Sequence, residues 1–156
     1  KVLSMPVSKN LVFIAKLVQV FFMILFSEIW ICTLFVISGK VIGLTSAIPW
    51  GKLVIWCLFG TLGGTVIAAI QLMISLFIKS FALPVGIALG GGLSGLVFLA
   101  KHLGHIWPYS LMAYGMNSNA PQELLESGYV WFVVICIVYI VLFMTISSMI
   151  LSRRDI

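Results

Sequence analysis

The sequence predicts an all-α, polytopic integral membrane protein, from its composition, the length of its apolar runs and the position of its charges. Of its 156 residues, 62% are hydrophobic and 8% are charged, whereas globular domains contain about 45–50% apolar and about 25% charged residues. Four apolar runs are long enough to cross a hydrocarbon core about 30 Å thick, and most charged residues lie between them. We therefore expect one transmembrane domain over residues 1–156.

The first apolar run is longer than a membrane requires. Residues 6–38 can form one helix of about 33 residues, which is about 50 Å long at about 1.5 Å per residue. We therefore expect residues 1–16 to form a cytoplasmic element and helix base, and residues 17–38 to form the span. Lys9 and Lys16 mark the part that stays in water or at the headgroups.

Glu28 lies near the middle of this first span. A carboxylate that faces lipid at that depth is costly, so Glu28 must face protein, water or a cation. Two interpretations are open. Glu28 is either a proton-coupling acid, or a structural acid that is hydrogen-bonded across the bundle to Gln71 or a tyrosine.

The second span, residues 50–78, carries small and polar side chains on one stripe. These residues recur at steps of three and four, which places them on one helix face. Small residues allow the close backbone contacts that hold membrane helices together, and two of the glycines have GxxxG spacing. The stripe consists of Gly60, Gly64, Ala68, Gln71 and Ser75.

The third span, residues 83–100, is rich in glycine and barely long enough to cross the membrane. Glycine weakens a helix in water but permits tight packing in lipid. This run is therefore either a close-packed helix or a helix broken at residues 90–92, as in many transporter sites. Its glycines are Gly86, Gly90, Gly91, Gly92 and Gly95.

Residues 101–128 form the only long interruption before the last span, residues 129–151. Trp107, Tyr109 and Tyr114 give this segment an interfacial character. We expect it to lie on the outer leaflet or to dip into it, as an exoplasmic interfacial or re-entrant segment. His102 and His105 could share a helix face as metal ligands, but no third ligand is nearby, so we predict no metal site.

The basic residues predict the orientation of the chain. If the first turn is cytoplasmic, six of them lie inside and three outside, as the positive-inside rule favours. Both ends of the chain are then cytoplasmic. The inner set is Lys1, Lys9, Lys16, Lys79, Arg153 and Arg154, and the outer set is Lys40, Lys52 and Lys101.

Several functional classes have no support in the sequence. The basic residues are spread singly and form no patch for nucleic acid. Cys32, Cys57 and Cys136 all lie in apolar runs without ligand spacing, so we interpret them as packing residues. No nucleotide-binding loop, HExxH or GxSxG motif occurs, and we expect no catalytic site in this chain.

The N-terminal segment resembles a known family. Residues 3–9, Leu-Ser-Met-Pro-Val-Ser-Lys, are similar to the "leucine, proline, valine, serine, arginine" segment of ABC-2 type transporter permeases. The basic tail at residues 152–156 and the Trp-Pro-Tyr-Ser and Tyr-Gly-Met motifs at residues 107–110 and 114–116 also resemble that family. Within it, the chain most resembles the E-type permeases of lantibiotic self-protection (immunity) transporters, which expel a producer's own peptide antibiotic.

This resemblance implies a six-helix permease of which the present chain holds the last four helices, in a bacterial cell membrane. The N-terminal segment would be the cytoplasmic coupling helix that contacts a separate ABC ATPase. Two copies of the ATPase would bind ATP and Mg²⁺, and a second, homologous permease would complete the complex. The chain itself would hold no cofactor, and its substrate would be an amphipathic cationic peptide. The residues placed in the coupling helix are Leu3, Met5, Pro6, Val7, Ser8 and Lys9.

Lys9 stands where the family more commonly has arginine, which keeps the charge but not the bidentate fork. The alternative from another class is a channel-like or structural membrane subunit that works without an ATPase. Co-purification separates the two, because only the permease requires a nucleotide-binding partner.

Overall fold

The computed structural model describes residues 9–43, 47–78, 80–117 and 128–153. The regular structure in this part of the chain consists of helices joined by turns, without strands. Four helices are long and apolar enough to cross a membrane, which confirms the predicted fold class. They are α1 (Lys9–Val41), α2 (Trp50–Phe77), α3 (Ala82–Ala100) and α5 (Tyr129–Arg153).

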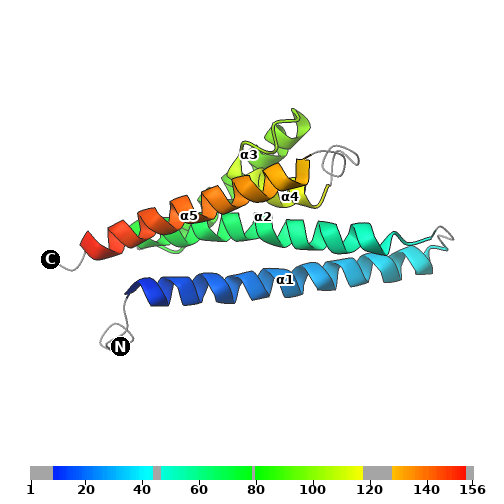
Figure 1. Cartoon of the computed structure of the whole chain (residues 1–156), viewed down its shortest axis with the longest axis horizontal. Helices are drawn as coiled ribbons and strands as arrows, with labels where there is room; N and C mark the ends of the chain where they lie inside the picture. The colour runs from blue at the N-terminus through cyan, green and yellow to red at the C-terminus, as the bar shows by residue number, and fades with distance from the viewer. Residues whose placement is uncertain (1–8, 44–46, 79, 118–127, 154–156) are drawn as a thin grey trace.

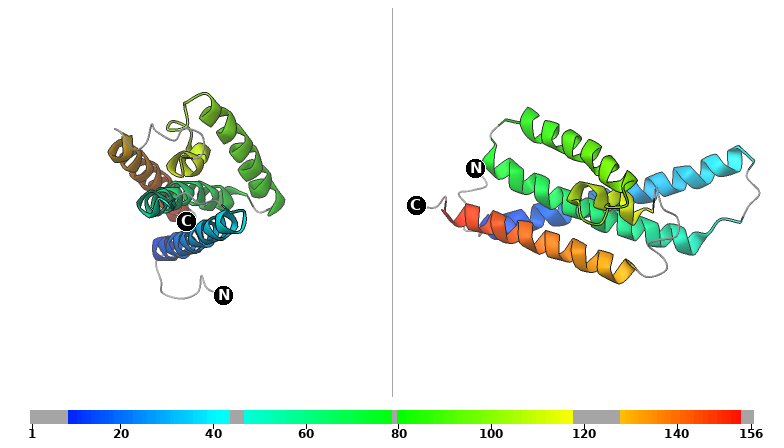
Figure 2. Two further views of the ribbon diagram at one scale, coloured as in Figure 1. Left: turned by 90° about the vertical axis from the view of Figure 1, so that its right-hand side faces the viewer. Right: turned by 90° about the horizontal axis from the view of Figure 1, so that it is seen from above.

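The central helix is α2. In the most apolar 18-residue stretch of α2, half of the residues are buried by the rest of the protein. The corresponding shares are 6% for α1, 11% for α3 and 17% for α5. Viewed along the bundle, α2 has α1 on one side, with α3 and α5 flanking it on the others (Figure 2). The outer helices therefore expose long apolar faces, as expected of helices that lie in lipid.

The helix α1 is continuous over 33 residues, so the predicted long first helix is confirmed in the described part of the chain. Its first residue is Lys9, and it runs three residues beyond the expected end at residue 38. The start of α1 and the end of α5 lie at the same end of the bundle (Figure 1). Which side of the membrane this end faces remains a prediction.

The helix α3 is unbroken from Ala82 to Ala100. Of the two alternatives for the glycine-rich run, the structure therefore shows the continuous helix. The three glycines at residues 90–92 are part of this helix, so it has no break there.

The described residues between α3 and α5 include two short helices, η2 (Pro108–Ser110) and α4 (Leu111–Gly115). They lie against α2, between α3 and α5 (Figure 2). We refer to residues 104–117 as the inserted segment. The buried core includes the inserted segment as well as α2 and α5, and its members are Val66, Ile70, Leu111, Phe132 and Cys136.

Candidate functional site

The inserted segment contacts the membrane helices through glycines. A Cβ atom at Gly63 of α2 would lie 2.5 Å from the carbonyl carbon of Leu111, and one at Gly95 of α3 would lie 3.0 Å from the carbonyl carbon of Tyr109. On the inserted segment itself, a Cβ at Gly115 would lie 2.6 Å from the carbonyl oxygen of Phe59. The backbones are therefore in direct contact at all three positions, and no larger residue fits without displacement.

Tyr109 joins α2 to α3. Its ring packs on Gly91, where a Cβ would lie 2.7 Å from Cδ1 of the ring, and its hydroxyl accepts a 2.8 Å hydrogen bond from Nε2 of Gln71. Burial raises the pKa of the Tyr109 hydroxyl, and the hydrogen bond from Gln71 lowers it in part. Gly91 is nine residues before the end of α3, which is about 13 Å along the helix, so Tyr109 lies well inside the bundle.

Hydrogen bonds and ring stacking hold the turn that leads into the inserted segment. The buried hydroxyl of Ser110 lies 2.6 Å from the carbonyl oxygens of Gly104 and Trp107. Tyr139 of α5 donates a 2.7 Å hydrogen bond to the carbonyl oxygen of Ile106. The Trp107 ring stacks on Phe98 of α3 with 5.1 Å between the ring centroids. These interactions tie the turn to α3 and α5.

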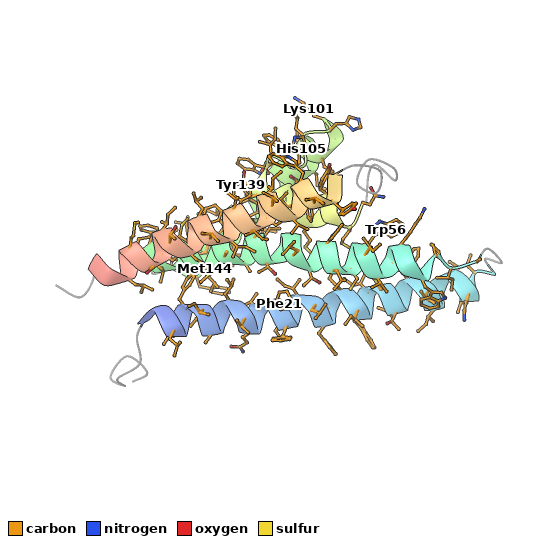
Figure 3. The ribbon with its side chains drawn as sticks, viewed as in Figure 1. Phe21, Trp56, Lys101, His105, Tyr139 and Met144 are labelled. Atoms are coloured by element: carbon orange, nitrogen blue, oxygen red, sulfur yellow. The ribbon has the colours of Figure 1, made fainter. Side chains whose placement is uncertain are left out.

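Figure 3 shows how this region lies relative to the seam between α1 and the rest of the bundle. Lys101 and His105 lie at the end of the molecule farthest from α1, and Phe21 lies on α1. The ring of His105 is 6.1 Å from that of Tyr114, which in turn is 5.9 Å from that of Phe132. Within the described residues, no group of three or more His, Cys, Asp or Glu side chains could hold a metal ion.

Glu28 of α1 is fully buried, with 0% of its surface exposed. A Cβ at Gly60 of α2 would lie 3.2 Å from Oε1 of Glu28 and 2.7 Å from Cγ of Met116, the residue after α4. Neither carboxyl oxygen has a hydrogen-bond partner within the described part of the chain. The hydrogen bond from Gln71 or a tyrosine, which was one of the two alternatives for Glu28, is therefore absent from the described residues, and Gln71 donates to Tyr109 instead.

The next contact along the same seam is at Gly64. A Cβ there would lie 3.0 Å from Cγ2 of Ile24 on α1 and 3.6 Å from Sδ of Met112 on α4. Gly60 and Gly64 are therefore the positions at which α1, α2 and the inserted segment meet. Both belong to the stripe of small residues that the sequence analysis identified.

Two cysteines lie near the contact of Glu28 with Gly60. Cys32 lies on α1, one helical turn after Glu28, and Cys57 lies on α2, three residues before Gly60. Cys57 is buried and Cys32 is partly exposed. Both line an apolar groove between α1 and α2 of about 420 Å³ that extends toward Trp50.

A second groove lies between α1, α2 and α3, at the α2–α3 turn. Its volume is about 730 Å³ and its lining is almost entirely apolar. Gln71 and Ser75 of α2 are among its polar lining residues, together with Ser80 of the turn. Gln71 therefore connects this groove to Tyr109 of the inserted segment.

The structure does not bring every predicted residue into this arrangement. Nothing in the described part of the chain lies within 4 Å of a Cβ at Gly86 or Gly90. Residues 3–8 of the coupling segment lie outside the described residues, and Lys9 is the first residue of α1. The roles assigned to all of these residues remain predictions.

Gly63 and Met112 were not singled out from the sequence, and Ser110, Gly115 and Met116 were named only as members of the family motifs at residues 107–110 and 114–116. For Gly63 a signal existed, because it precedes Gly64 of the stripe. For the others no local pattern indicates a contact with α2, because that contact joins segments about 50 residues apart.

The described part of the chain is a bundle of apolar helices with an internal helical segment packed against its central helix. Residues 1–95 match the family model of the ABC-2 family transporter proteins. The match covers more than half of the chain, and the protein belongs to this family. It is thus a multi-pass membrane permease of an ABC transporter. No curated protein and no solved structure is significantly similar to the chain.

Proposed function

We propose that this chain is the permease subunit of a bacterial ABC exporter that removes a peptide antibiotic of the lantibiotic class from the membrane and so gives self-immunity. ATP hydrolysis on a separate subunit, present in two copies, would drive the cycle, and a second homologous permease would complete the pathway. The chain would hold no catalytic site or cofactor, since ATP and Mg²⁺ would bind to the ATPase.

The observation that carries the proposal is the three-way contact along α1. This helix is continuous from Lys9, and Glu28 and Ile24 on it meet α2 and the inserted segment at Gly60 and Gly64. Lys9 is 19 residues before Glu28, which is about 28 Å along a helix. A push on the coupling segment would therefore reach the inserted segment through one rigid helix.

The weak burial of α1 supports movement of this helix. Only 6% of the residues in its most apolar 18-residue stretch are buried, so little protein surface has to be separated when the helix tilts. Its contact with α2 depends on small residues, which allow a helix to slide without large side chains blocking it. The tilt would change the packing along the stripe from Gly60 to Ser75 and against α3.

The inserted segment is the proposed entry for the substrate. We propose that residues 101–128 dip into the outer leaflet, because Tyr109 packs about 13 Å inward from the end of α3. Trp107, Tyr109 and Tyr114 would face an amphipathic cationic peptide at that depth. Movement of α1 would then change the packing of the segment where the peptide binds.

Reversal of the charge at Lys9 together with truncation of two neighbours tests the coupling. The triple variant Met5→Ala, Val7→Ala and Lys9→Glu should abolish the ATP turnover that the permease stimulates in its ATPase, while the amount of inserted protein stays unchanged. The matched control is Lys40→Glu, the same charge reversal near the other end of α1. Unchanged turnover in the triple variant, or equal loss in both variants, contradicts the proposed coupling.

Co-purification of the full-length chain tests the class of protein. The permease should purify with an ABC ATPase in stoichiometric amount and confer resistance to a cationic lantibiotic when both genes are expressed in sensitive cells. A homo-oligomer without an ATPase would instead favour the channel-like or structural subunit.

A further inference from the structure

The junction around Glu28 contains an acid for which the described structure offers no partner. Glu28 is the one acidic residue in the described part of the chain, and it is fully buried. None of its described neighbours donates a hydrogen bond to either carboxyl oxygen. The packing leaves no space for an additional group at Gly60, because a Cβ there would already meet Glu28 Oε1 at 3.2 Å and Met116 Cγ at 2.7 Å.

Among the described residues, the groups that face Glu28 carry no positive charge. On α1 the nearest titratable side chain is Cys32, one helical turn further on, and on α2 it is Cys57, three residues before Gly60. On the inserted segment the neighbour is Met116, followed by Asn117, whose Nδ2 is also buried without a partner. An ionised carboxylate at this position would be both desolvated and unpaired, which is the most unfavourable state for a buried charge.

We propose that Glu28 is a proton-binding site and that its protonated form closes α1 against α2 and the inserted segment. In the separated arrangement the carboxyl O–H bond breaks as the proton forms a bond to a water oxygen, and the reverse transfer restores the neutral acid. Ionisation requires water or a cation at the carboxylate, and the closed junction has no room for either. Loss of the proton therefore separates α1 from Gly60 and Met116. This proposal concerns the junction itself and stands whether or not the substrate is a lantibiotic.

The sign of the pH dependence follows from this exclusion. If the closed arrangement admits only the neutral acid, a rise in pH depletes it in favour of the separated arrangement. At pH values well above the titration midpoint of the carboxyl, the population of the closed arrangement then falls about tenfold for each further pH unit. At low pH the closed arrangement is fully favoured.

The thiols of Cys32 and Cys57 provide a native reporter for the separation of α1 and α2, because they line the same groove from opposite helices. The full-length protein in lipid vesicles, with Cys136→Ala to leave one pair of thiols among the cysteines of the chain, is treated with a short bifunctional thiol reagent from acidic to alkaline pH. Glu28→Gln is the matched control, because it keeps the shape and cannot ionise. The ratio of the two cross-linking yields cancels the pH dependence of the thiols themselves.

We expect the cross-linking yield of the Glu28 protein, divided by that of the Glu28→Gln protein, to fall with rising pH. At high pH the fall should approach about tenfold per pH unit. A ratio that is constant across the pH range overturns the proposal. If Glu28→Gln does not fold, infrared spectroscopy decides. In protein carrying Glu123→Gln and Glu126→Gln, Glu28 is the only glutamate among these 156 residues, so within this sequence ¹³C-labelled glutamate reports on Glu28 alone. A protonated carboxyl band at neutral pH that disappears at alkaline pH supports the site, whereas carboxylate bands only, or a band that never titrates, overturns it.

Discussion

Substitution of Gly63 by alanine should loosen the inserted segment. The added Cβ would lie 2.5 Å from the carbonyl carbon and oxygen of Leu111 and 2.6 Å from the backbone nitrogen of Met112, whereas ordinary van der Waals contact begins at 3.4 Å. Because all three neighbours are backbone atoms, no side chain can rotate away. The backbones of α2 and α4 must therefore separate by about 0.9 Å. Overpacking of this kind costs about 1–3 kcal/mol.

The assay is thermal unfolding of the purified full-length protein in detergent. For a chain of this size, each kcal/mol lowers Tm by about 2–4 °C, so Gly63→Ala should lower Tm by several degrees. The matched control is Gly92→Ala on α3, where nothing lies within 4 Å of the added Cβ and alanine favours the helix. If the two substitutions change Tm equally, the close contact between α2 and α4 does not exist.

Two further substitutions test the inserted segment. Tyr109→Phe removes the hydrogen bond from Gln71 and should cost about 0.6 kcal/mol, the average for such bonds in membranes; in a double-mutant cycle with Gln71→Leu, additive losses of stability would contradict the bond. Ser110→Ala removes the buried hydroxyl that bonds to Gly104 and should cost about 1 kcal/mol in unfolding, and an unchanged stability would show that this hydroxyl does not hold the turn.

The four membrane helices could be predicted from the sequence because their signal is local. Apolar runs of sufficient length can satisfy their backbone hydrogen bonds in lipid only as helices, so length and composition decide the structure. For the same reason the expected ranges 50–78 and 83–100 agree with α2 and α3 to within one residue. The stripe through Gly60 and Gly64 also followed from helical periodicity.

The inserted segment could not be placed in the same way. Pro108 and the aromatic residues around it indicate an interface or a turn, but its contacts are made with Gly63 and Gly91, far away in the chain. Such contacts depend on how α2 and α3 diverge, which no local pattern encodes. The glycines showed that something approaches closely, and only the structure shows what it is.

The possible pairing of Glu28 with Gln71 illustrates a limit of reasoning from helix faces alone. Gln71 lies on the same stripe as Gly60, but it is 11 residues further along α2, a distance of about 16 Å on the helix axis. Glu28 meets the helix at Gly60, so Gln71 is out of its reach. Tyr109, which comes from the inserted segment, takes the hydrogen bond instead.

The proposed permease uses its partner's ATP hydrolysis to remove a peptide from the membrane. The most direct measurement is the amount of a fluorescent cationic lantibiotic bound to vesicles that contain the complete complex, followed after ATP is added. We expect the bound peptide to decrease with ATP and to stay constant when the ATPase carries an inactivating substitution. A constant amount with the active ATPase, or the same decrease with the inactive one, would refute ATP-driven removal of the peptide.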